Sequence, residues 1–501
     1  MSEIVQIRHG VYVDSVSLMQ VSRDVGATPG VTAALVAMAT ELNLELMGGM
    51  GFSADEPTIP NDLIVAVRAV DDDALAAGLA AVDSTLAALR SAGASSGGFG
   101  APPPPRTLRS AVRAGEANLA LISVPGSSAT AEAFDALDAG VSVMLFSDNV
   151  PVADEVALKT AAGERGLLVM GPDCGTAVIG GVALGFANAV RRGSVGLVAA
   201  SGTGAQQVMC LLDAAGVGMS HCLGVGGRDL SVAVGGRSTL QALDALAADE
   251  ATTSIVVVSK PPAAEVLAAV EAHAATLGRP VHWAILGPGR PDLTASTEAA
   301  LTADGHPVPR WPVWRGVDAD APVPGALRGL FCGGTLADEA MLVAAEALGD
   351  IASNIPLRPD LALGADLRSP GHVVIDFGDD SLTQGRAHPM IDPTLRMERI
   401  AAEAADPTCG VLLLDLVLGY GSHPDPAGEL ADAIGSARAT AAADGRELPV
   451  VVSLTGVEGD PQGLTACAEA LAAAGASVFV SNAAATRHAI RQLAVAAGKE
   501  S

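Results

Sequence analysis

The sequence predicts an α/β protein made of tandem doubly wound parallel-sheet domains, of flavodoxin-like or Rossmann-like type, preceded by a small α+β domain. Three observations predict this class. Beyond residue 107, short apolar strands alternate with Ala-rich amphipathic helices, a rhythm typical of parallel sheets. Two blocks of this part repeat the same motifs in the same order. A stretch rich in Gly, Ser and Pro separates them from a first segment of different pattern.

The composition excludes several classes of function. The chain has 501 residues, with 56 Asp and Glu against 29 Lys and Arg, for a net charge of −27. Nucleic acid and anionic membranes repel such a chain, so we expect neither as a partner. No apolar run is long enough for a membrane span and the N-terminus lacks a signal-peptide pattern, so we expect a cytoplasmic protein. The scattered cysteines, and the spacing of His, Asp and Glu, indicate no metal site.

The first domain is predicted to span residues 1–90. It has a strand in IVQI, a helix in DSVSLMQVSRDV, and strand-like or buried runs in ALVAM and LIVAVRAV. It closes on a capped amphipathic helix, DDDALAAGLAAVDSTLAALR. Residues 91–106, SAGASSGGFGAPPPPR, cannot continue a helix or a central strand, so they are predicted to be a linker.

Three α/β blocks follow the linker. The runs ANLALISV, VSVMLFS and LLVMG place a Rossmann-type domain at 107–192. The runs SVGLVAA, HCLGVG, SIVVVS and PVHWAIL place the next domain at 193–306. After a Pro-rich linker at 307–325, the runs GLFC, VVID, GVLLLDLV, LPVVVSL and ASVFVS place the last domain at 326–501. The two Pro-rich stretches predict three folded units.

The last two domains are predicted to be repeats of one fold. VGLVAASGTGAQQVMCLLDAAG (195–216) resembles RGLFCGGTLADEAMLVAAEALG (328–349), each with an apolar strand, a Gly/Thr loop and an Ala-rich helix. Further along each repeat, SIVVVSKPPAAEVLAAV (254–270) resembles GVLLLDLVLGYGSHPDPAGELADAI (410–434). The matching segments thus occur in the same order in both repeats. An insertion around 357–397 explains the wider spacing of the second repeat.

The two Gly/Thr turns are candidate anion sites. Small residues at a strand-to-helix turn let an anion approach backbone N–H groups, and the helix dipole adds about half a positive charge. A tight turn with a Ser or Thr N-cap is the structural alternative for either turn alone. Two such helix ends facing each other would clamp one phosphate. The predicted phosphate-binding residues are Ser201, Gly202, Thr203, Gly204, Gly333, Gly334 and Thr335.

Other candidates follow predicted strands. Lys260, one of three lysines, ends a central strand and is expected to face a ligand, with an edge charge as the alternative. Asn149, Asp173 and Cys174 are candidate substrate-binding or CoA-binding residues at strand ends. A cysteine in such a place more often packs beside a turn than acts as a nucleophile.

The insertion holds the densest polar cluster, DFGDDSLTQGRAHPMIDPTLRMER at 376–399. Two prolines and two glycines predict a structured loop. Arg386 suits planar carboxylates, carbamoyl groups and phosphates, and His388 suits proton transfer. A salt-bridged loop at a subunit contact is the alternative. The cluster consists of Asp376, Asp379, Asp380, Arg386, His388, Asp392 and Arg396.

The chain resembles two related families. LISVPGSSATAEAFDALDAG and the residues after it look like the CoA-binding domain of succinyl-CoA synthetase α subunits, and GSVGLVAASGTGAQQV looks like their ligase domain. Residues 326–495 are similar to the carboxyl-terminal domain of the β subunit. DSVSLMQVSRD, MGPDCGTA, GVGGRDLS, VSKPPA, CGGTLADEA and GRAHPMIDPTLR resemble the FdrA proteins more closely.

The chain departs from the synthetases where their chemistry lies. Their phosphohistidine motif, GHAGA, is replaced by ILGPGRPDLTASTEAAL, and their strand-end Glu by Ser259-Lys260-Pro261. No ATP-grasp domain precedes the β-like part, and residues 1–90 with their linker replace the Gly-rich CoA loop. We therefore expect no autophosphorylation on histidine.

The FdrA resemblance implies a carbamoyltransferase subunit of ureide (allantoin) catabolism. There, oxalurate and phosphate exchange with oxamate and carbamoyl phosphate, alongside two partner subunits. We expect an oligomer with partner subunits encoded nearby, phosphate or carbamoyl phosphate as substrate, and no established cofactor, with CoA as a candidate. By residue type, Lys260 or Arg386 would stabilise negative charge and His388 would move the proton. The alternatives are an ADP-forming acyl-CoA synthetase subunit that binds CoA, and a non-catalytic scaffold.

Overall fold

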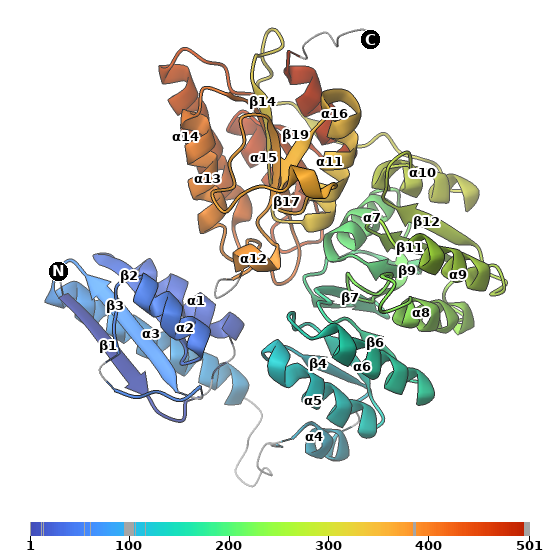
Figure 1. The fold of residues 1–501 in the computed structure, drawn as a ribbon, viewed down its shortest axis with the longest axis horizontal. Helices are drawn as coiled ribbons and strands as arrows, with labels where there is room; N and C mark the ends of the chain where they lie inside the picture. Colours follow the sequence, from blue (N-terminus) through green and yellow to red (C-terminus); the bar gives the residue numbers. More distant parts are fainter. Residues whose placement is uncertain are drawn as a thin grey trace. The chain divides into compact units, whose positions relative to one another are not determined.

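A computed structural model describes residues 2–11, 13, 15–54, 56–60, 62–94, 105, 107–115, 117–383 and 387–494. Contacts divide the chain into two compact units, residues 1–105 with 381–387 and residues 106–380 with 388–501. Both units combine helices with sheets, as the sequence predicts (Figure 1). Among the described residues, no helix is both long enough and apolar enough to cross a membrane.

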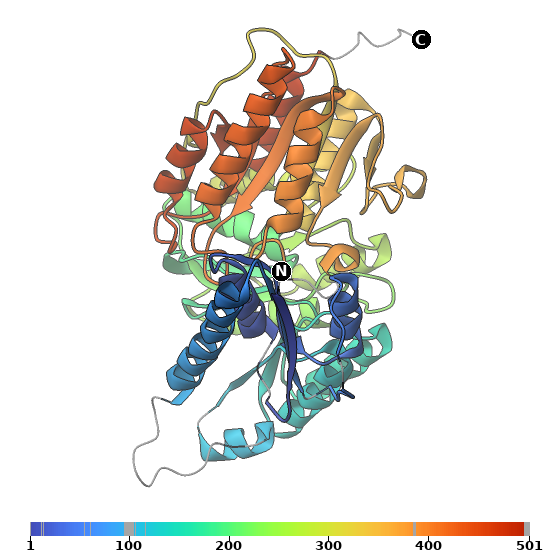
Figure 2. The ribbon, with the colours of Figure 1, turned by 90° about the vertical axis from the view of Figure 1, so that its left-hand side faces the viewer.

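The first unit is a small α+β domain. Its antiparallel sheet has the order β1-β3-β2, and its elements are β1 (Ser2–Arg8), α1 (Ser15–Gly26), β2 (Val31–Met38), α2 (Glu41–Gly49), β3 (Leu63–Ala69) and α3 (Asp72–Ala94). Helices α1 and α3 pack on one face and α2 packs on the other (Figure 2). The helix α2 was not predicted; Thr40 caps it by accepting from Asn43 N. Helix α3 continues to Ala94, inside the predicted linker, and residues 95–104 lie outside the described residues.

The second unit begins with a parallel three-stranded sheet of order β4-β5-β6. It is built from α4 (Leu108–Ala114), β4 (Leu119–Ile122), α5 (Gly126–Asp138), β5 (Ser142–Leu145), α6 (Val152–Glu164) and β6 (Val169–Met170). Pairing is parallel throughout, as expected for a Rossmann-type domain.

A six-stranded sheet follows, with the order β12-β11-β9-β10-β7-β8. Its strands are β7 (Thr176–Ile179), β8 (Val182–Gly185), β9 (Arg192–Ala200), β10 (Met219–Gly224), β11 (Ser254–Ser259) and β12 (Val281–Ile285). Its helices are α7 (Gly202–Ala214), α8 (Arg237–Ala248), α9 (Ala264–Ala274) and α10 (Leu293–Ala303). The antiparallel hairpin β7–β8 was not predicted, and it moves residues 176–185 from the preceding domain into this sheet.

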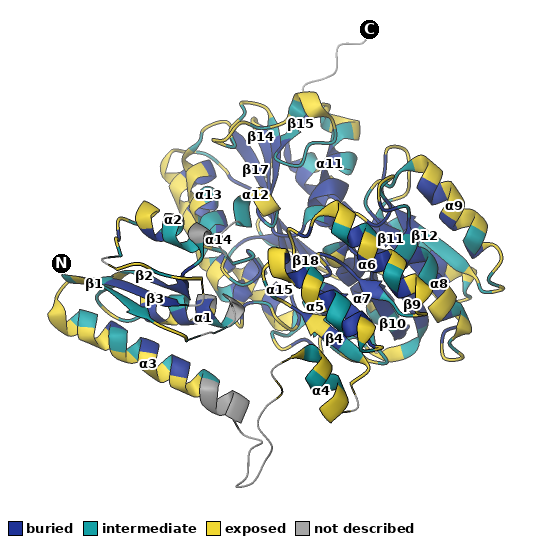
Figure 3. Ribbon diagram, turned by 60° about the horizontal axis from the view of Figure 1, so that its bottom comes forward, coloured by how far each residue is buried: buried dark blue, intermediate teal, exposed yellow. Residues whose placement is uncertain are grey.

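The last sheet has seven strands in the order β13-β19-β18-β17-β14-β16-β15. They are β13 (Val313–Trp314), β14 (Ala326–Phe331), β15 (Ile351–Ser353), β16 (His372–Asp376), β17 (Cys409–Val417), β18 (Val450–Thr455) and β19 (Ser477–Phe479). The helices are α11 (Gly334–Leu348), η1 (Pro359–Leu361), α12 (Asp380–Thr383), α13 (Thr394–Ala405), α14 (Pro426–Ala443), α15 (Leu464–Ala473) and α16 (Asn482–Gln492). All nine residues of β17 are buried, as helix-covered parallel sheets require (Figure 3).

The tandem repeat is visible in the strand pairing. In the first repeat β9 lies between β10 and β11, and in the second β14 lies between β16 and β17, each followed by its Gly/Thr turn and helix. The two repeats form separate sheets, and contacts group both sheets in one compact unit, where the Pro-rich stretch at 307–325 led us to expect two folded units. That Pro-rich segment is also tied down, with β13 pairing to β19 and Trp311 Nε1 donating to Glu298 Oε1 at 2.7 Å.

Candidate functional site

The candidate site lies where parallel strands of the two repeats end. Ser201 follows β9, Lys260 follows β11, and Asp376 is the last residue of β16. The turn Cys332-Gly333 follows β14. Because ligands bind at the carboxyl ends of strands in open α/β sheets, this is the edge where a site is expected.

The N-termini of α7 and α11 lie against each other. The hydroxyl oxygens of Ser201 and Thr335 are 2.6 Å apart, and either can donate. A Cβ placed on Gly333 would lie 2.9 Å from Cγ2 of Thr203, and one on Gly204 would lie 2.9 Å from Cγ2 of Thr335. Each threonine therefore packs on the glycine of the other turn. The structure brings the two turns together, and phosphate binding between them stays a prediction.

At the first turn, Ser201 is the N-cap of α7. Its Oγ accepts a hydrogen bond from Gly204 N at 3.0 Å. Ser201 therefore has the N-cap role that was the structural alternative to an anion site. Ser201 and Gly204 are buried, whereas Gly202 is exposed and Thr203 is half-buried. An anion can therefore reach this helix end only at Gly202 and Thr203.

At the second turn, a carboxylate of the protein already occupies backbone donors. Cys332 N and Gly333 N donate to the two carboxylate oxygens of Asp415, in β17, at 2.8 and 2.9 Å. Arg396 Nη2 lies 3.2 Å from Asp415 Oδ1 and neutralises that carboxylate. The prediction that Gly333 offers its N–H to a phosphate is therefore wrong, and Gly334 is the accessible position at this turn.

Lys260 reaches the start of the second helix. Its Nζ lies 3.5 Å from Asp338 Oδ2, and its side chain is 39% exposed. A Cβ on Gly334 would lie 3.0 Å from Lys260 Nζ and 2.6 Å from Asp376 Oδ2. Desolvation opposes the charge of Lys260, but Asp338 and Asp376 outweigh it and raise the pKa of the ammonium. A permanent cation and two carboxyl groups therefore meet around Gly334.

Asp376 is placed for proton transfer. It is 5% exposed, and its Oδ1 accepts from Gly378 N at 2.9 Å. Asn354 fixes its backbone by donating to the carbonyl oxygen and accepting from the N–H. Burial, opposed by Lys260, raises the pKa of Asp376 to about 7. A carboxyl group with such a pKa can both accept and release a proton near neutral pH.

His388 is less suited to that role than the sequence indicates. Burial lowers the pKa of His388 to about 4, so the ring is neutral at pH 7. Its Nδ1 accepts from Met390 N at 3.2 Å, which places the ring proton on Nε2. The ring packs against Phe186 with centroids 5.5 Å apart. His388 is thus a neutral hydrogen-bond donor, while Arg386 lies outside the described residues.

Asn149 and Asp173 follow the carboxyl ends of β5 and β6. Both are exposed and adopt left-handed backbone conformations, with φ of 54° and 57°. Non-glycine residues of this kind concentrate at functional sites. Although Asp173 meets water, protein surrounds it closely, and this desolvation, with Asp380 and Asp148, raises the pKa of Asp173 to about 7.

Cys174, by contrast, belongs to the core. It is 3% exposed, and burial raises the pKa of its thiol to about 12. A protonated thiol with no access to solvent neither binds a ligand nor attacks one. The assignment of Cys174 to a binding site is therefore wrong, and the packing role holds.

The insertion is only partly a loop. Helix α13 begins at Thr394, directly after Pro393, and Asp392 Oδ1 accepts from Thr394 N at 3.0 Å. A proline before the first helical residue starts a helix rather than breaking it. Arg396 lies in α13 and is 2% exposed, so it holds Asp415 rather than a ligand.

Three groups at this edge were not predicted. Asp338 sits near the start of α11 and pairs with Lys260. Asp415 stands alone among apolar residues in GVLLLDLV, a signal that a charged group in a buried strand has a specific partner. Arg228, in the FdrA-like GVGGRDLS, follows β10 and acts with Lys260 on the carboxyl group of Asp173.

A separate groove lies away from these residues. Its volume is about 970 Å³, and it is lined by α8 and by residues at the amino ends of β4, β5 and β6, among them Leu119, Ser142 and Leu168. None of the predicted site residues lines it. Among the described residues, no group of three or more His, Cys, Asp or Glu side chains is arranged to hold a metal ion.

Two family models match the chain. One, described as CoA-ligase, covers residues 330–491, and the other, described as the heavy metal-associated domain of AllF, covers residues 1–101. With the tandem sheets and the paired helix N-termini, the first match defines the class: an α/β protein with an enzyme-like fold of CoA-ligase type.

Full-length similarity gives the family. The uncharacterized protein YahF of Escherichia coli (strain K12) is 40% identical over 501 residues, covering 95% of each chain. The chain belongs to the FdrA-like family, and the AllF model that matches residues 1–101 describes a domain found in that family.

More distant relatives share only parts. Succinate–CoA ligase [ADP-forming] subunit alpha 2 of Archaeoglobus fulgidus is 30% identical over 158 residues, 31% of this chain and 54% of that subunit. The chain thus spans about half the length of this relative. The dinucleotide forming acetyl-coenzyme A synthetase 1 of Ca. Korarchaeum cryptofilum aligns over 79% of this chain and 86% of its own at 15% identity, with a TM-score of 0.30.

The first unit does not fit a heavy metal. Residues 1–101 contain no cysteine, and thiolates are the ligands that soft ions select. The single histidine of this segment, His9, has its Nδ1 3.1 Å from Asp62 Oδ2, which offers an ion pair instead of a metal site.

Proposed function

We propose that the chain is an FdrA-type carbamoyltransferase subunit of ureide (allantoin) catabolism, exchanging oxalurate plus phosphate with oxamate plus carbamoyl phosphate. One observation carries the proposal: Lys260 and Asp376 meet over Gly334, at a helix N-terminus that faces a second one. A cation and a proton carrier beside two partial positive charges suit an anionic nucleophile. The family membership supports the pathway.

The chain's own groups would divide the reaction as follows. Phosphate binds at the accessible positions Gly202, Thr203 and Gly334. A phosphate oxygen attacks the terminal ureido carbonyl of oxalurate, and Lys260 stabilises the oxyanion that forms. The bond from that carbon to the oxamate nitrogen then breaks. Asp376 takes the phosphate proton during attack and returns it to the departing nitrogen, so it ends the cycle unchanged.

The carboxyl groups around Lys260 are compatible with anionic substrates. Because burial raises the pKa of Asp376 to about 7, and desolvation with Asp380 raises that of Asp173 to about 7, neither is fully charged near neutral pH. In their ionised form, their oxygens accept hydrogen bonds, and the carbamoyl group offers N–H donors. The site thus supplies partners for both the phosphate and the NH₂ end of the substrate.

Substitution of Lys260 tests the proposal. Lys260→Met keeps most of the stem volume, and removal of one preorganised charge from a transition state lowers turnover by roughly a hundredfold, or about 3 kcal/mol. Phosphate-dependent formation of carbamoyl phosphate from oxalurate would be measured with the chain and its genomic neighbours co-purified. Arg165→Met is the control, because Arg165 is exposed and pairs with Asp138 on the surface. A loss of less than about threefold for Lys260→Met would contradict the assignment.

A second candidate is an ADP-forming acyl-CoA synthetase-like subunit, favoured by the CoA-ligase match over residues 330–491. It predicts ATP formation from succinyl-CoA, ADP and phosphate when the neighbours are present, and CoA would then be a substrate. A scaffold without turnover is the remaining alternative. It predicts binding of oxamate without consumption of oxalurate. We also infer partner subunits and an oligomeric complex from the same family resemblance, and a cytoplasmic location from the sequence pattern.

A further inference from the structure

The groove at the amino ends of β4, β5 and β6 lies against a sheet face that is incompletely covered. One face of this three-stranded sheet packs on α5 and α6, through Ala120 and Val143. The opposite face carries Leu119 and Met170, which line the groove and belong to the core shared with the six-stranded sheet. Leu121, two residues after Leu119 and on the same face, is 49% exposed. Parallel sheets normally bury both faces, so apolar surface here is left without a cover.

Two helices and a hairpin enclose the groove. The hairpin β7–β8 contributes Ile179, Val182 and Leu184, and Val182 is 61% exposed. The end of α6 and the second half of α8 form a further part of the wall. A Cβ on Gly163, in α6, would lie 2.6 Å from Gln241 Nε2, in α8, so only glycine lets the two helices approach this closely.

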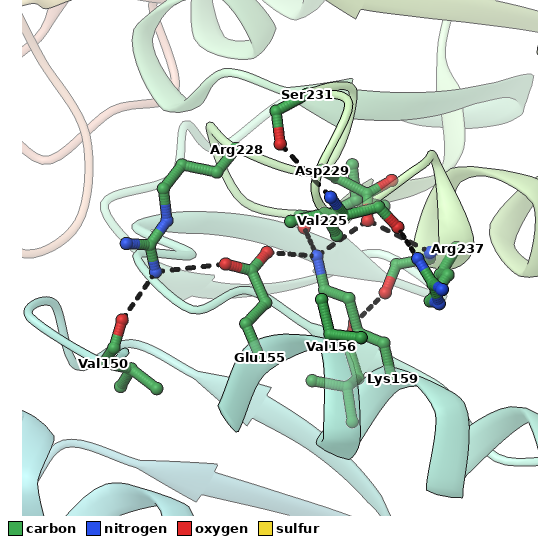
Figure 4. Close-up of polar contacts among 12 residues, drawn as sticks. Val150, Glu155, Val156, Lys159, Val225, Arg228, Asp229, Ser231 and Arg237 are labelled. Carbon is green, nitrogen blue, oxygen red and sulfur yellow. Dashed lines mark hydrogen bonds and ion pairs between the residues drawn. The ribbon is translucent and has the colours of Figure 1, made fainter. Parts of the chain in front are cut away.

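A buried ion network fixes these two helices against each other. Lys159, in α6, has no exposed side-chain surface, and its Nζ donates to Glu155 Oε1 and to Asp229 Oδ1, each at 2.7 Å (Figure 4). Asp229 in turn accepts from Thr239 N, at the start of α8, at 2.9 Å. The wall of the groove is therefore held in place without a ligand, and such preorganisation lowers the free-energy cost of binding.

The charges of the groove exclude anions. Among the described residues that line it there is no Lys or Arg, and the charged side chains are Asp244 and Asp249. His221 Nδ1 accepts from Gly180 N at 3.1 Å, so its proton lies on Nε2, which is 3.5 Å from Asp249 Oδ2. A phosphate or carboxylate placed here would meet two carboxylates and no cation in the wall. The groove thus differs from the edge that carries Lys260.

The wall also has an unused hydrogen-bonding group. The side-chain amide of Gln241 makes no hydrogen bond within the described part of the chain, although its Oε1 is buried. An amide offers two donors and one acceptor, and buried polar groups normally have a partner. A ligand with one polar group beside an apolar body would supply that partner.

We propose that this groove is a second ligand site, which takes a small molecule that has an apolar body and is uncharged or cationic. Sites for small molecules have volumes of about 300 to about 1,000 Å³ and are mostly apolar with a few polar groups, as this groove is. The groove shares no residue with the edge of Lys260 and Asp376, and the inference does not depend on the proposed function. A ligand here binds alongside phosphate and does not compete with it.

The test is a fluorescence titration of the full chain with two probes of the same ring system. N-phenyl-1-naphthylamine is uncharged, and 1-anilinonaphthalene-8-sulfonate carries one negative charge. We expect the uncharged probe to bind at one site per chain and the sulfonate to bind at least about tenfold more weakly. Addition of inorganic phosphate should leave the affinity for the uncharged probe unchanged.

Two substitutions in α8 locate the binding. Ala245 is exposed and lines the groove, so Ala245→Phe places a ring where the probe would lie. We expect the affinity for N-phenyl-1-naphthylamine to fall by about tenfold or more. Ala248→Phe is the control, because Ala248 is exposed on the same helix and does not line the groove. Equal probe affinity in the two variants would overturn the site.

A charge reversal tests the class of ligand. Asp244→Lys should strengthen binding of the sulfonate by about 5- to 10-fold and change that of the uncharged probe by less than about threefold. Glu346→Lys is the control, because it makes the same change of net charge at an exposed position of α11. Equal gains in both variants would mean that the groove does not select by charge.

The remaining outcomes also decide the proposal. Absence of saturable binding of N-phenyl-1-naphthylamine by the unaltered chain overturns it, and so does displacement of that probe by phosphate. Sedimentation velocity identifies a different occupant. If the chain self-associates, Ala245→Phe abolishes the association, and the probe binds only the dissociated chain, the groove is an interface between two copies and not a small-molecule site.

Discussion

Helices α7 and α11 begin with similar Gly/Thr turns but carry different polar side chains in the residues that follow. Aligned on their caps, SGTGAQQ (201–207) and GGTLADE (333–339) place Gln206 and Gln207 opposite Asp338 and Glu339. Gln207 reaches into the second repeat, donating to Val480 O at 2.8 Å, and Glu339 reaches into the first, accepting from Leu293 N at 2.6 Å. The repeat kept the geometry and exchanged neutral amides for carboxyl groups.

The caps differ as well. Helix α7 is capped by its own Ser201, whereas the turn before α11 is held by Asp415 from a neighbouring strand, with Arg396 behind it. The start of α7 is therefore held by a residue of the same turn, whereas the start of α11 is held by buried residues from other elements of its domain. This difference concentrates charge, and with it the chemistry of Lys260 and Asp376, at the second turn.

The largest expected effect is at Asp415. Asp415→Ala leaves Arg396 buried without its partner and two backbone N–H groups unsatisfied, so the free energy of unfolding should fall by about 3–5 kcal/mol. Ser201→Ala removes only a cap and should lower it by about 1 kcal/mol. Urea unfolding of both variants measures the contrast, with the exposed Asp432→Ala as control. A larger loss for Ser201→Ala would refute the distinction between the two turns.

The second effect concerns pH. Burial raises the pKa of Glu339 from 4.5 to about 7. Between these values the unfolded chain ionises this group and the folded chain keeps it protonated, so its contribution makes the protein less stable as pH rises from about 4.5 to about 7. Glu339→Gln should remove that fall and stabilise the protein at pH 8 by up to about 3 kcal/mol.

Thermal unfolding between pH 5 and pH 8 measures this effect for Glu339→Gln. Gln207→Glu is the matched variant in the other repeat, and it should introduce a similar loss of stability at high pH. If Glu339→Gln and the unaltered protein respond to pH in parallel, Glu339 does not titrate in this range.

The smallest effect tests the contact between the turns. Gly333→Ala would bring Cβ to 2.9 Å from Cγ2 and Oγ1 of Thr203, so the free energy of unfolding should fall by about 1–3 kcal/mol. Thr203→Ala removes both atoms and should restore most of the loss. Gly435→Ala is the control, since Gly435 is an exposed residue of α14 and a Cβ there meets nothing within 4 Å. A double-mutant cycle without coupling would mean that the turns do not touch in solution.

Much of the fold follows from local pattern. Runs rich in Val and Leu predict the strands β9, β11 and β17. The sequence repeat also predicted that the turns after β9 and β14 would be alike. The hairpin β7–β8 was missed because its run, TAVIGGVALG, is short and its two strands are joined by a Gly-Gly turn. Sequence order alone also gave no sign that this run joins the following sheet.

The site was predictable by residue type and not by protonation state. Lys260 was found because lysine is rare in this chain and ends a strand. Asp376 and His388 stood in one motif, and only burial shows that the pKa of Asp376 rises to about 7 while that of His388 falls to about 4. Asp415 and Arg396 are 19 residues apart in sequence and meet only through packing of α13 on the sheet.

The hairpin β7–β8 also sets where the chain can be cut. It supplies the outer strands of the six-stranded sheet, so a fragment that starts at residue 193 would leave β10 as an unpaired edge. Exposed edges of this kind recruit other chains through their free N–H and C=O groups. Residues 176–185 thus protect the edge of β10 from association with other chains. The six-stranded sheet is complete only in a fragment that keeps β7 and β8.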